Sequence, residues 1–457
     1  MDATDLCFAG AAEQARLVAA GDISARELVD ATLARIEALQ PRVNAYSVVL
    51  DERARIEADQ ADARHRAGEE RPLLGVPVAI KDDVDVAGQV TAWGTAAHGP
   101  AKERDAEVVR RLRSAGAIIV GKTLTPELMM LPATDTTTFG AARNPWDLSR
   151  TPGGSSGGTG AAVAAGLCGV ALGSDGAGSI RGPAAWCGLV GLKPRRDLVP
   201  LAPHDGAWQG LSVSGPLARR TADAALFMDA AAPGHDFAGA VARGPGRLRV
   251  AVSVKAPPGA QFKLGREERA AVDALAADLR ALGHDVVERD PDYPPSLWGA
   301  AYARVLRGIH DDVATLPHTD RLEARTRHAA ALGGLLSGGL MRRVHAAEAE
   351  QARRIGELFR DVDVLVTPSC AEGPYFAGEM GRRSIVGWAA TASRRIPYFV
   401  AFNVTGQPAI NVPAGHDDDG LPMGVQIVGR PDGDATLLAL AAQLEARRDW
   451  SANRPVL

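Results

Sequence analysis

Two glycine-rich turns, residues 153–158 and 173–178, each deliver a serine that could do chemistry. Glycine accepts backbone angles that other residues avoid, so such turns can bring backbone N–H groups close to a ligand. Serines beside converging N–H donors in an apolar site are what acyl transfer requires. The small, uncharged run between the turns, residues 160–172, predicts a buried helix that leads into a short strand at residues 170–172.

A serine nucleophile needs a base, and histidine is the usual one. None of the ten histidines lies in a recognisable catalytic or metal-binding pattern. Several, His204 among them, fall in loops rich in glycine, proline and aspartate. The chain has no H-E-x-x-H motif and no Cys/His cluster, so metal chemistry has no support.

Lys81 is then the leading candidate base, because it ends an apolar strand where loss of water would favour the neutral amine. The alternative is a solvated loop lysine paired with Asp82 and Asp83, which would raise its pKa. Residues 153–157 also match the G-x-S-x-G pattern, but no strand precedes the serines. The glycine turns fit neither a P-loop nor a dinucleotide fingerprint.

Strands and helices alternate from end to end, which favours one large α/β domain. The strand predictions are residues 73–80, 117–120, 170–172, 189–192, 211–213, 248–254, 284–288, 362–367, 399–413 and 422–428. The helix predictions are several helices within residues 10–70, one with an N-cap at Asp22–Ser24, then 105–114, 123–131, 160–172, 222–231, 267–282, 295–360 and 435–446.

The composition excludes several classes of protein. A length of 457 residues points to two or three domains, although large α/β sheets reach this size as one unit. The net charge of −4 and the scattered lysines and arginines exclude a nucleic-acid binder. The N-terminus lacks a signal peptide, and no apolar run is long enough for a membrane span. With four cysteines that form no C-x-x-C pair, a soluble cytoplasmic protein is expected.

Three segments decide the identification: LLGVPVAIKDDVDV, NPWDLSRTPGGSSGGTGAAVAAG and GSDGAGSIRGPAAWCGLVGLKP. They resemble the amidase signature family of serine hydrolases, and the match extends to residues 215–230 and 402–431. The resemblance implies a twisted mixed β-sheet with helices on both faces, forming one amidase domain over residues 1–457. Within it, residues 1–70 are N-terminal helices, 72–231 the signature core and 290–390 a variable, mostly helical, substrate-facing region.

The resemblance assigns a role to each of three residues. The family's catalytic lysine falls on Lys81, its bridging serine, which follows a cis peptide bond, on Ser155, and its nucleophile on Ser179. The spacings of 74 and 24 residues select Ser155 over Ser156, which is then structural or a helper in the lysine's hydrogen-bond network.

The oxyanion hole is expected from the backbone N–H groups of Gly176, Ala177 and Gly178, with Ser179 as a further donor. Asp175 and Arg181 are interpreted as an ion pair that shapes this turn. The family commonly has D-[TI]-G-G-S here, and Gly176 lacks that side chain, which is expected to loosen or widen the turn.

These features predict an amidohydrolase that cleaves small-molecule carboxylic amides through an acyl-enzyme, without a cofactor or metal. Met129, Met130, Leu131 and Trp208 are predicted to line the pocket for an apolar or aryl acyl group, with core packing as the alternative. A homodimer is expected by analogy.

Two other functions stay open. The first is an amidotransferase A-subunit, which hydrolyses glutamine beside partner subunits; its usual GGSIRQPA and S-x-E-N-S-x-F-G segments are replaced here by AGSIRGPA and ATDTTTFG. The second is a non-catalytic binding protein that retains the fold.

Overall fold

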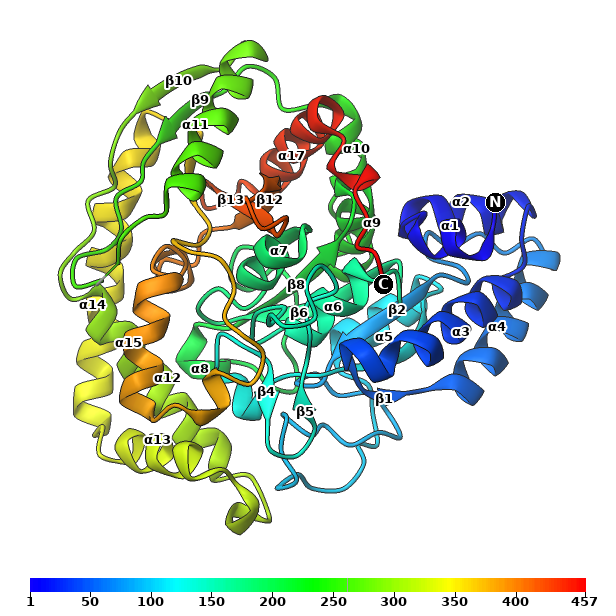
Figure 1. The fold of residues 1–457 in the computed structure, drawn as a ribbon, viewed down its shortest axis with the longest axis horizontal. Helices are drawn as coiled ribbons and strands as arrows, with labels where there is room; N and C mark the ends of the chain where they lie inside the picture. Colours follow the sequence, from blue (N-terminus) through cyan, green and yellow to red (C-terminus); the bar gives the residue numbers. More distant parts are fainter. Residues whose placement is uncertain (261) are drawn as a thin grey trace.

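The computed structural model describes residues 1–260 and 262–457, and its centre is a large mixed β-sheet of eleven strands (Figure 1). Across the sheet the strands are β1 (Tyr46–Val49), β3 (Ile118–Thr123), β2 (Pro77–Lys81), β6 (Val170–Asp175), β8 (Val213–Ala218), β7 (Val190–Lys193), β12 (Ala409–His416), β13 (Pro422–Gly429), β11 (Val364–Pro368), β9 (Arg249–Val252) and β10 (Asp285–Glu288). Two short strands, β4 (Asp135–Thr136) and β5 (Gly140–Ala141), pair with each other apart from this sheet.

One edge of the sheet collects the polar side chains discussed below. β2 lies between β3 and β6 and is parallel to both, so these three strands end at the same edge. β8 is antiparallel to β6 and begins there, with Ser214 opposite Ser174. Residues at and after the carboxyl ends of β2 and β6 therefore meet, as is common where α/β sheets bind ligands.

Helices cover both faces of the sheet, because alternate residues of each buried strand point to opposite sides. On one face, Val78, Ile80 and Leu172 pack in a core with four helices. These are α5 (Glu107–Ser114), α9 (Thr221–Ala231), α11 (Arg266–Ala281) and α17 (Asp434–Arg448).

The opposite face is covered in two parts. Ala79 and Ala171 pack against α3 (Ala25–Val43), α4 (Asp51–Arg66), α6 (Gly157–Ala164) and α7 (Arg181–Cys187). A second group, drawn in yellow-green to orange in Figure 1, packs on the β11–β13 half. It contains α12 (Leu297–Val313), α13 (Ala324–Gly334), α14 (Gly338–Gly356), α15 (Ile385–Arg395) and α16 (Val400–Val404).

Short helices complete the chain. The α-helices are α1 (Ala3–Phe8), α2 (Ala11–Ala20), α8 (Ala207–Gly210) and α10 (Phe237–Arg243). The 3-10 helices are η1 (Glu127–Met129), η2 (Thr319–Arg321), η3 (Glu357–Arg360), η4 (Met380–Arg382) and η5 (Trp450–Ala452). Among the described residues, every helix is too short or too polar to serve as a bilayer span.

The predicted α/β architecture, with a mixed sheet between two helical layers, is confirmed. Most predicted elements lie within a few residues of their predicted bounds, and the hairpin of β12 and β13 is present. The predicted N-cap is Ser24, whose side chain accepts the Glu27 N–H while Glu27 accepts the Ser24 N–H, a reciprocal capping box.

Three predictions of local structure are wrong. The helix over residues 123–131 is replaced by the end of β3 and the single turn η1, because Leu128 and Met129 adopt left-handed angles with φ of 46° and 57°. Residues 400–404 form α16 before β12 begins, instead of one continuous strand. The N-terminal helices are interrupted by β1, which pairs with β3. In each case packing against distant segments overrides the local pattern.

Candidate active site

Lys81 ends β2 in the protein interior, with no exposed surface. Its Nζ lies 2.7 Å from Ser155 Oγ and 2.7 Å from Ser174 Oγ, and Asp83 Oδ2 is 3.4 Å away. Burial lowers the pKa of Lys81 below its usual value, and this effect outweighs the opposing effect of the Asp83 carboxylate. The Lys81 amine is therefore easier to deprotonate than an exposed lysine.

The two aspartates after Lys81 turn to different partners. Asp82 Oδ1 lies 2.7 Å from Lys122 Nζ, and both side chains are buried. Of these two aspartates, Asp83 is the one that stays beside Lys81, and the more distant Asp175 adds a weaker attraction. The alternative prediction of a solvated loop lysine is therefore wrong, because Lys81 is a buried strand residue.

Ser174, in β6, fixes the direction of the hydrogen bonds around the amine. Its hydroxyl donates to Asp83 Oδ2, so its oxygen is left to accept from Lys81. An uncharged amine that donates one N–H to Ser174 keeps its lone pair free for another partner. Ser155 Oγ, at the same 2.7 Å distance, is placed to donate to that lone pair.

The first glycine-rich turn presents Ser155 just before α6. The Gly154–Ser155 peptide bond is cis, as the resemblance implies. The neighbouring Ser156 serves the backbone instead: its hydroxyl donates to the Ser174 carbonyl at 3.1 Å and accepts the Ser174 N–H at 3.3 Å. Of the two roles expected for Ser156, the structural one is the one that these bonds describe.

The second turn presents Ser179 and is built around a buried ion pair. Arg181 Nη2 lies 2.9 Å from Asp175 Oδ1, and neither side chain is exposed. Asp175 also accepts the N–H of Gly178 at 2.7 Å and of Ile180 at 3.1 Å. Although burial alone would raise it, the Arg181 guanidinium holds the pKa of Asp175 well below its usual value. The interpretation of this pair as a device that shapes the turn is confirmed.

The backbone donors of this turn divide into two kinds. The Gly178 N–H is directed at Asp175, whereas no hydrogen bond within residues 1–260 and 262–457 uses the N–H of Gly176, Ala177 or Ser179. Gly178 has φ of 114°, and a Cβ there would lie 2.3 Å from Phe399 Cδ2. Only glycine fits that position.

The space beside Gly176 is occupied by a neighbouring side chain, so the expected loosening of the turn is not observed. A Cβ at Gly176 would lie 2.7 Å from Trp208 Cε3, which means that the indole ring occupies the space of the missing side chain. Trp208 is held from the other side by α12, because a Cβ at Gly308 would lie 2.7 Å from Trp208 Cα. Trp208 therefore packs between the turn that carries Ser179 and α12.

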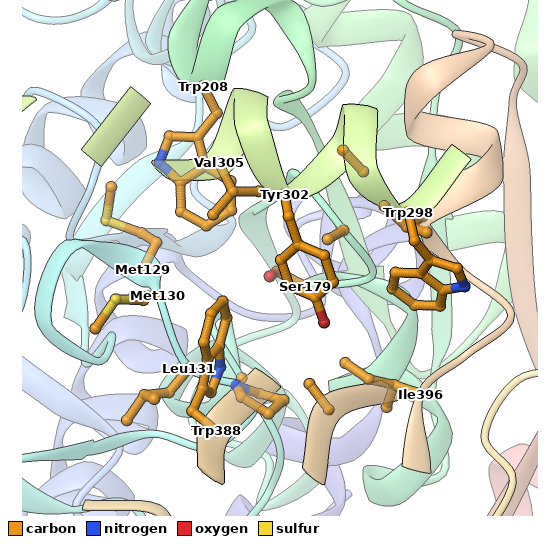
Figure 2. Close-up of a pocket in the computed structure, with 16 residues that line it drawn as sticks. Met129, Met130, Leu131, Ser179, Trp208, Trp298, Tyr302, Val305, Trp388 and Ile396 are labelled. Carbon is orange, nitrogen blue, oxygen red and sulfur yellow. The ribbon is translucent and has the colours of Figure 1, made fainter. Parts of the chain in front are cut away.

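Ser179 opens on a cavity, called here the apolar chamber. Figure 2 shows α12 crossing above Ser179, with Val305, Tyr302 and Trp298 along it, and Trp388 below. All four residues predicted to bind the acyl group lie in its wall. Its main side chains are those of Met129, Met130, Leu131, Ser179, Trp208, Trp298, Tyr302, Val305, Trp388, Ile396 and Val400.

A second cavity, called here the polar chamber, shares Met129, Ser179 and Trp208 with the first. Ser155 lines the polar chamber together with Ser179. No hydrogen bond among the described residues joins the two hydroxyls directly, but the Ser156 N–H donates to the Ser179 carbonyl at 3.2 Å and ties the two turns together. The other polar side chains of its wall are those of Asp83, Ser174, His204, Ser212, Ser214 and Asp312.

The residues that complete the two chambers were not predicted from the sequence. Trp298, Tyr302 and Val305 follow the i, i+4, i+7 spacing of one helix face, and this signal was available in the region where the resemblance was weakest. Ser174 and Asp83 lie inside the quoted motifs but carry no pattern of their own. Within the described residues, no three His, Cys, Asp or Glu side chains are grouped closely enough to hold a metal ion.

Comparison with known proteins gives a consistent result over the whole chain. A family model described as Amidase matches residues 27–438. "Putative amidase AmiB2" of Mycobacterium tuberculosis is 57% identical over 459 residues, covering 100% of this chain and 99% of that protein.

Two solved structures resemble the fold closely. The structure of 6-aminohexanoate cyclic dimer hydrolase complexed with substrate superposes with a TM-score of 0.91 at 33% identity, covering 98% of this chain and 99% of that one. A bacterial aryl acylamidase described as a member of the amidase signature enzymes has a TM-score of 0.86 at 26% identity, with 98% and 99% covered. These relatives favour amide hydrolysis over the amidotransferase and the non-catalytic alternatives.

Proposed function

The chain belongs to the amidase signature family and is an amide-hydrolysing enzyme, and from this premise we propose that Ser179 is its nucleophile, with Ser155 and neutral Lys81 as the proton relay. The observation that carries the proposal is the buried amine of Lys81, which lies 2.7 Å from Ser155 Oγ and has a lowered pKa. A buried amine whose pKa is lowered, lying beside a hydroxyl, is a base suited to activating serine.

The direction of proton transfer follows from Asp83 and Ser174. Because Ser174 donates to Asp83 and accepts from Lys81, the lone pair of the neutral amine is available to Ser155. Ser155 passes its proton to Lys81 and takes the proton of Ser179, whose oxygen attacks the amide carbonyl. Ser174 and Asp83 act through Lys81 and are positioning residues.

The oxyanion that forms on attack needs N–H donors that are not already used. We assign this role to the backbone N–H groups of Gly176 and Ala177, with Ser179 as the third donor. Gly178, which was also expected to be a donor, is excluded because its N–H donates to Asp175. When the intermediate collapses, the C–N bond breaks and the nitrogen leaves with the relay proton. Water then cleaves the acyl-enzyme by the same relay.

The acyl group occupies the apolar chamber. Its wall of three tryptophans, two methionines and aliphatic side chains supports an apolar or aryl acyl group over a charged one. The similarity to an enzyme titled as an aryl acylamidase supports the same class. A homodimer stays a prediction by analogy with the family, and a cytoplasmic location stays a prediction from the sequence.

A labelling experiment tests the nucleophile. A fluorophosphonate probe is expected to label the protein, and the label should disappear in Ser179→Ala but persist in Ser149→Ala, which changes an exposed loop serine. Hydrolysis of phenylacetanilide should be lost with the label. Persistent labelling of a folded Ser179→Ala protein would overturn the assignment.

A further inference from the structure

Ser179 and Trp208 line both chambers. One face of α12 runs along both of them. Trp298, Tyr302 and Val305 face the apolar chamber, Gly308 packs on Trp208, and Asp312 lines the polar chamber. The face thus changes from aromatic to acidic where the helix passes Trp208.

The proposed relay decides which half of the substrate enters which chamber, so this inference rests on the proposed function. The leaving nitrogen must receive its proton from Ser155. Ser155 lines the polar chamber and is absent from the wall of the apolar one, among the described residues. The acyl half therefore lies in the apolar chamber and the amine half in the polar chamber.

Negative charge in the polar chamber is incompletely matched by the protein. The Asp83 side chain is 9% exposed; its Oδ2 accepts from Ser174, whereas its Oδ1 is buried and has no hydrogen-bond partner within the described part of the chain. A buried acceptor without a donor is costly unless a ligand supplies one. No lysine or arginine belongs to the described wall, and its one histidine, His204, has its Nε2 3.2 Å from Asp85, so an occupant of the chamber can supply the donor.

The end of α12 adds negative charge to the polar chamber. Asp312 lies in the last turn of the helix, where the exposed carbonyl groups already carry partial negative charge. Such a position normally favours a cation. Trp93 and Trp208 contribute aromatic surface to the same wall, and an aromatic face attracts ammonium groups.

We propose that the polar chamber binds the amine half of the substrate through a positively charged group, so that the preferred substrates are amides in which an apolar acid is joined to a diamine or another cationic amine. The ammonium group lies between Asp83 and Asp312. It also opposes protonation of Lys81, because a cation beside Asp83 offsets the carboxylate that favours the charged lysine.

The experiment compares phenylacetamides whose nitrogen carries an ω-aminoalkyl chain of two to five carbons with the N-alkyl amides of equal length. For the intact enzyme at pH 7.5, the best aminoalkyl amide should have kcat/KM at least about tenfold above its neutral counterpart. Asp312→Asn should remove most of this preference, so that the ratio of kcat/KM between the aminoalkyl amide and its N-alkyl counterpart falls to about one.

Asp311→Asn is the matched control, because the Asp311 carboxylate accepts from Arg307 and Gln209 and does not belong to the described chamber wall. It should keep the preference. If Asp312→Asn does not fold, Asp312→Ser replaces it.

The outcomes separate the two proposals. If the intact enzyme hydrolyses none of these amides, or if Ser179→Ala keeps full activity, the proposed relay is refuted. Hydrolysis of neutral amides with no preference for the ammonium series, or a preference that survives in folded Asp312→Asn, would overturn the cationic site alone. A preference that appears only when the ammonium group is on the acyl half would overturn the assignment of the chambers.

Discussion

The two sides of this active site are constructed in different ways. On the sheet side, Lys81 and Ser174, at the ends of neighbouring strands, are linked through the lysine amine to Ser155 in the turn before α6. On the helical side, α12 and α15 contribute large side chains that meet the cavity mainly through apolar surface. The sheet side joins residues far apart in sequence through polar contacts, whereas the helical side presents consecutive turns of a helix.

This difference separates reactivity from selectivity. A hydrogen-bond network tolerates little change, because each polar group depends on the next one and a buried group left without a partner is costly. An apolar wall can change size and shape while the network stays intact. Changes on the sheet side should therefore reduce turnover of all amides alike, and changes on the helical side should alter the ratio between amides.

The largest effect is expected from Lys81→Ala, which removes the base of the sheet side. We predict a fall in kcat of about 10³-fold for aryl and alkyl amides alike, because general-base catalysis is lost for each of them. Steady-state kinetics on two amides would measure it. Lys102→Ala, which changes a partly exposed lysine beside Asp85, should stay within about twofold of the unchanged enzyme. A Lys81→Ala enzyme that keeps normal turnover would place the base elsewhere.

The next largest effect is expected at the contact between Gly176 and Trp208, where the two sides meet. Gly176→Thr would push its side chain into the Trp208 ring, and overpacking of this kind lowers the free energy of unfolding by about 1–3 kcal/mol. Thermal or urea unfolding would measure the loss. Adding Trp208→Ala should restore part of it, whereas Gly299→Thr, whose Cβ meets nothing within 4 Å, should cost much less. Equal costs at the two glycines would contradict the packing argument.

A change confined to the helical side should be smaller and selective. Trp298→Ala removes one aromatic wall of the apolar chamber, so kcat/KM for phenylacetyl amides should fall about tenfold while that for acetyl amides stays within about twofold. Paired kinetics with the same leaving amine would show the ratio. A uniform loss for both acyl groups would mean that α12 takes part in the chemistry itself.

The smallest effect is expected on the pH profile of Asp83→Asn. The proposed relay needs neutral Lys81, so kcat/KM should fall as the pH decreases through the pKa of Lys81. The Asp83 carboxylate raises that pKa in opposition to burial, and its removal lowers the pKa further. The acid limb of the profile should therefore move to lower pH. An unchanged limb, or a shift to higher pH, would show that another group controls it.

Much of the sheet side could be predicted from sequence, because its residues lie in long motifs. The apolar run that ends at Lys81 indicated a buried strand, and the resemblance selected Ser155 and Ser179. The partners of these residues were not predictable. Whether Asp82 or Asp83 stays beside the lysine depends on the position of Lys122 in β3, which no local pattern reveals.

The helical side was predicted only in outline. Its helices were expected, but the apolar positions of α12 fit a buried core face equally well until the chamber is seen. The Gly176 prediction failed for a related reason: the missing side chain is replaced by Trp208, which lies 32 residues later in the chain.

The sequence alone determined the α/β class, the family resemblance and the three residues proposed as the relay, because hydrophobic periodicity and contiguous motifs are local properties of the chain. Only the tertiary structure decided which carboxylate faces Lys81, which N–H groups remain free near Ser179, and how α12 divides its face between two chambers. Those outcomes depend on contacts between segments that are distant in sequence, where burial changes the pKa of Lys81 and packing gives Trp208 its place.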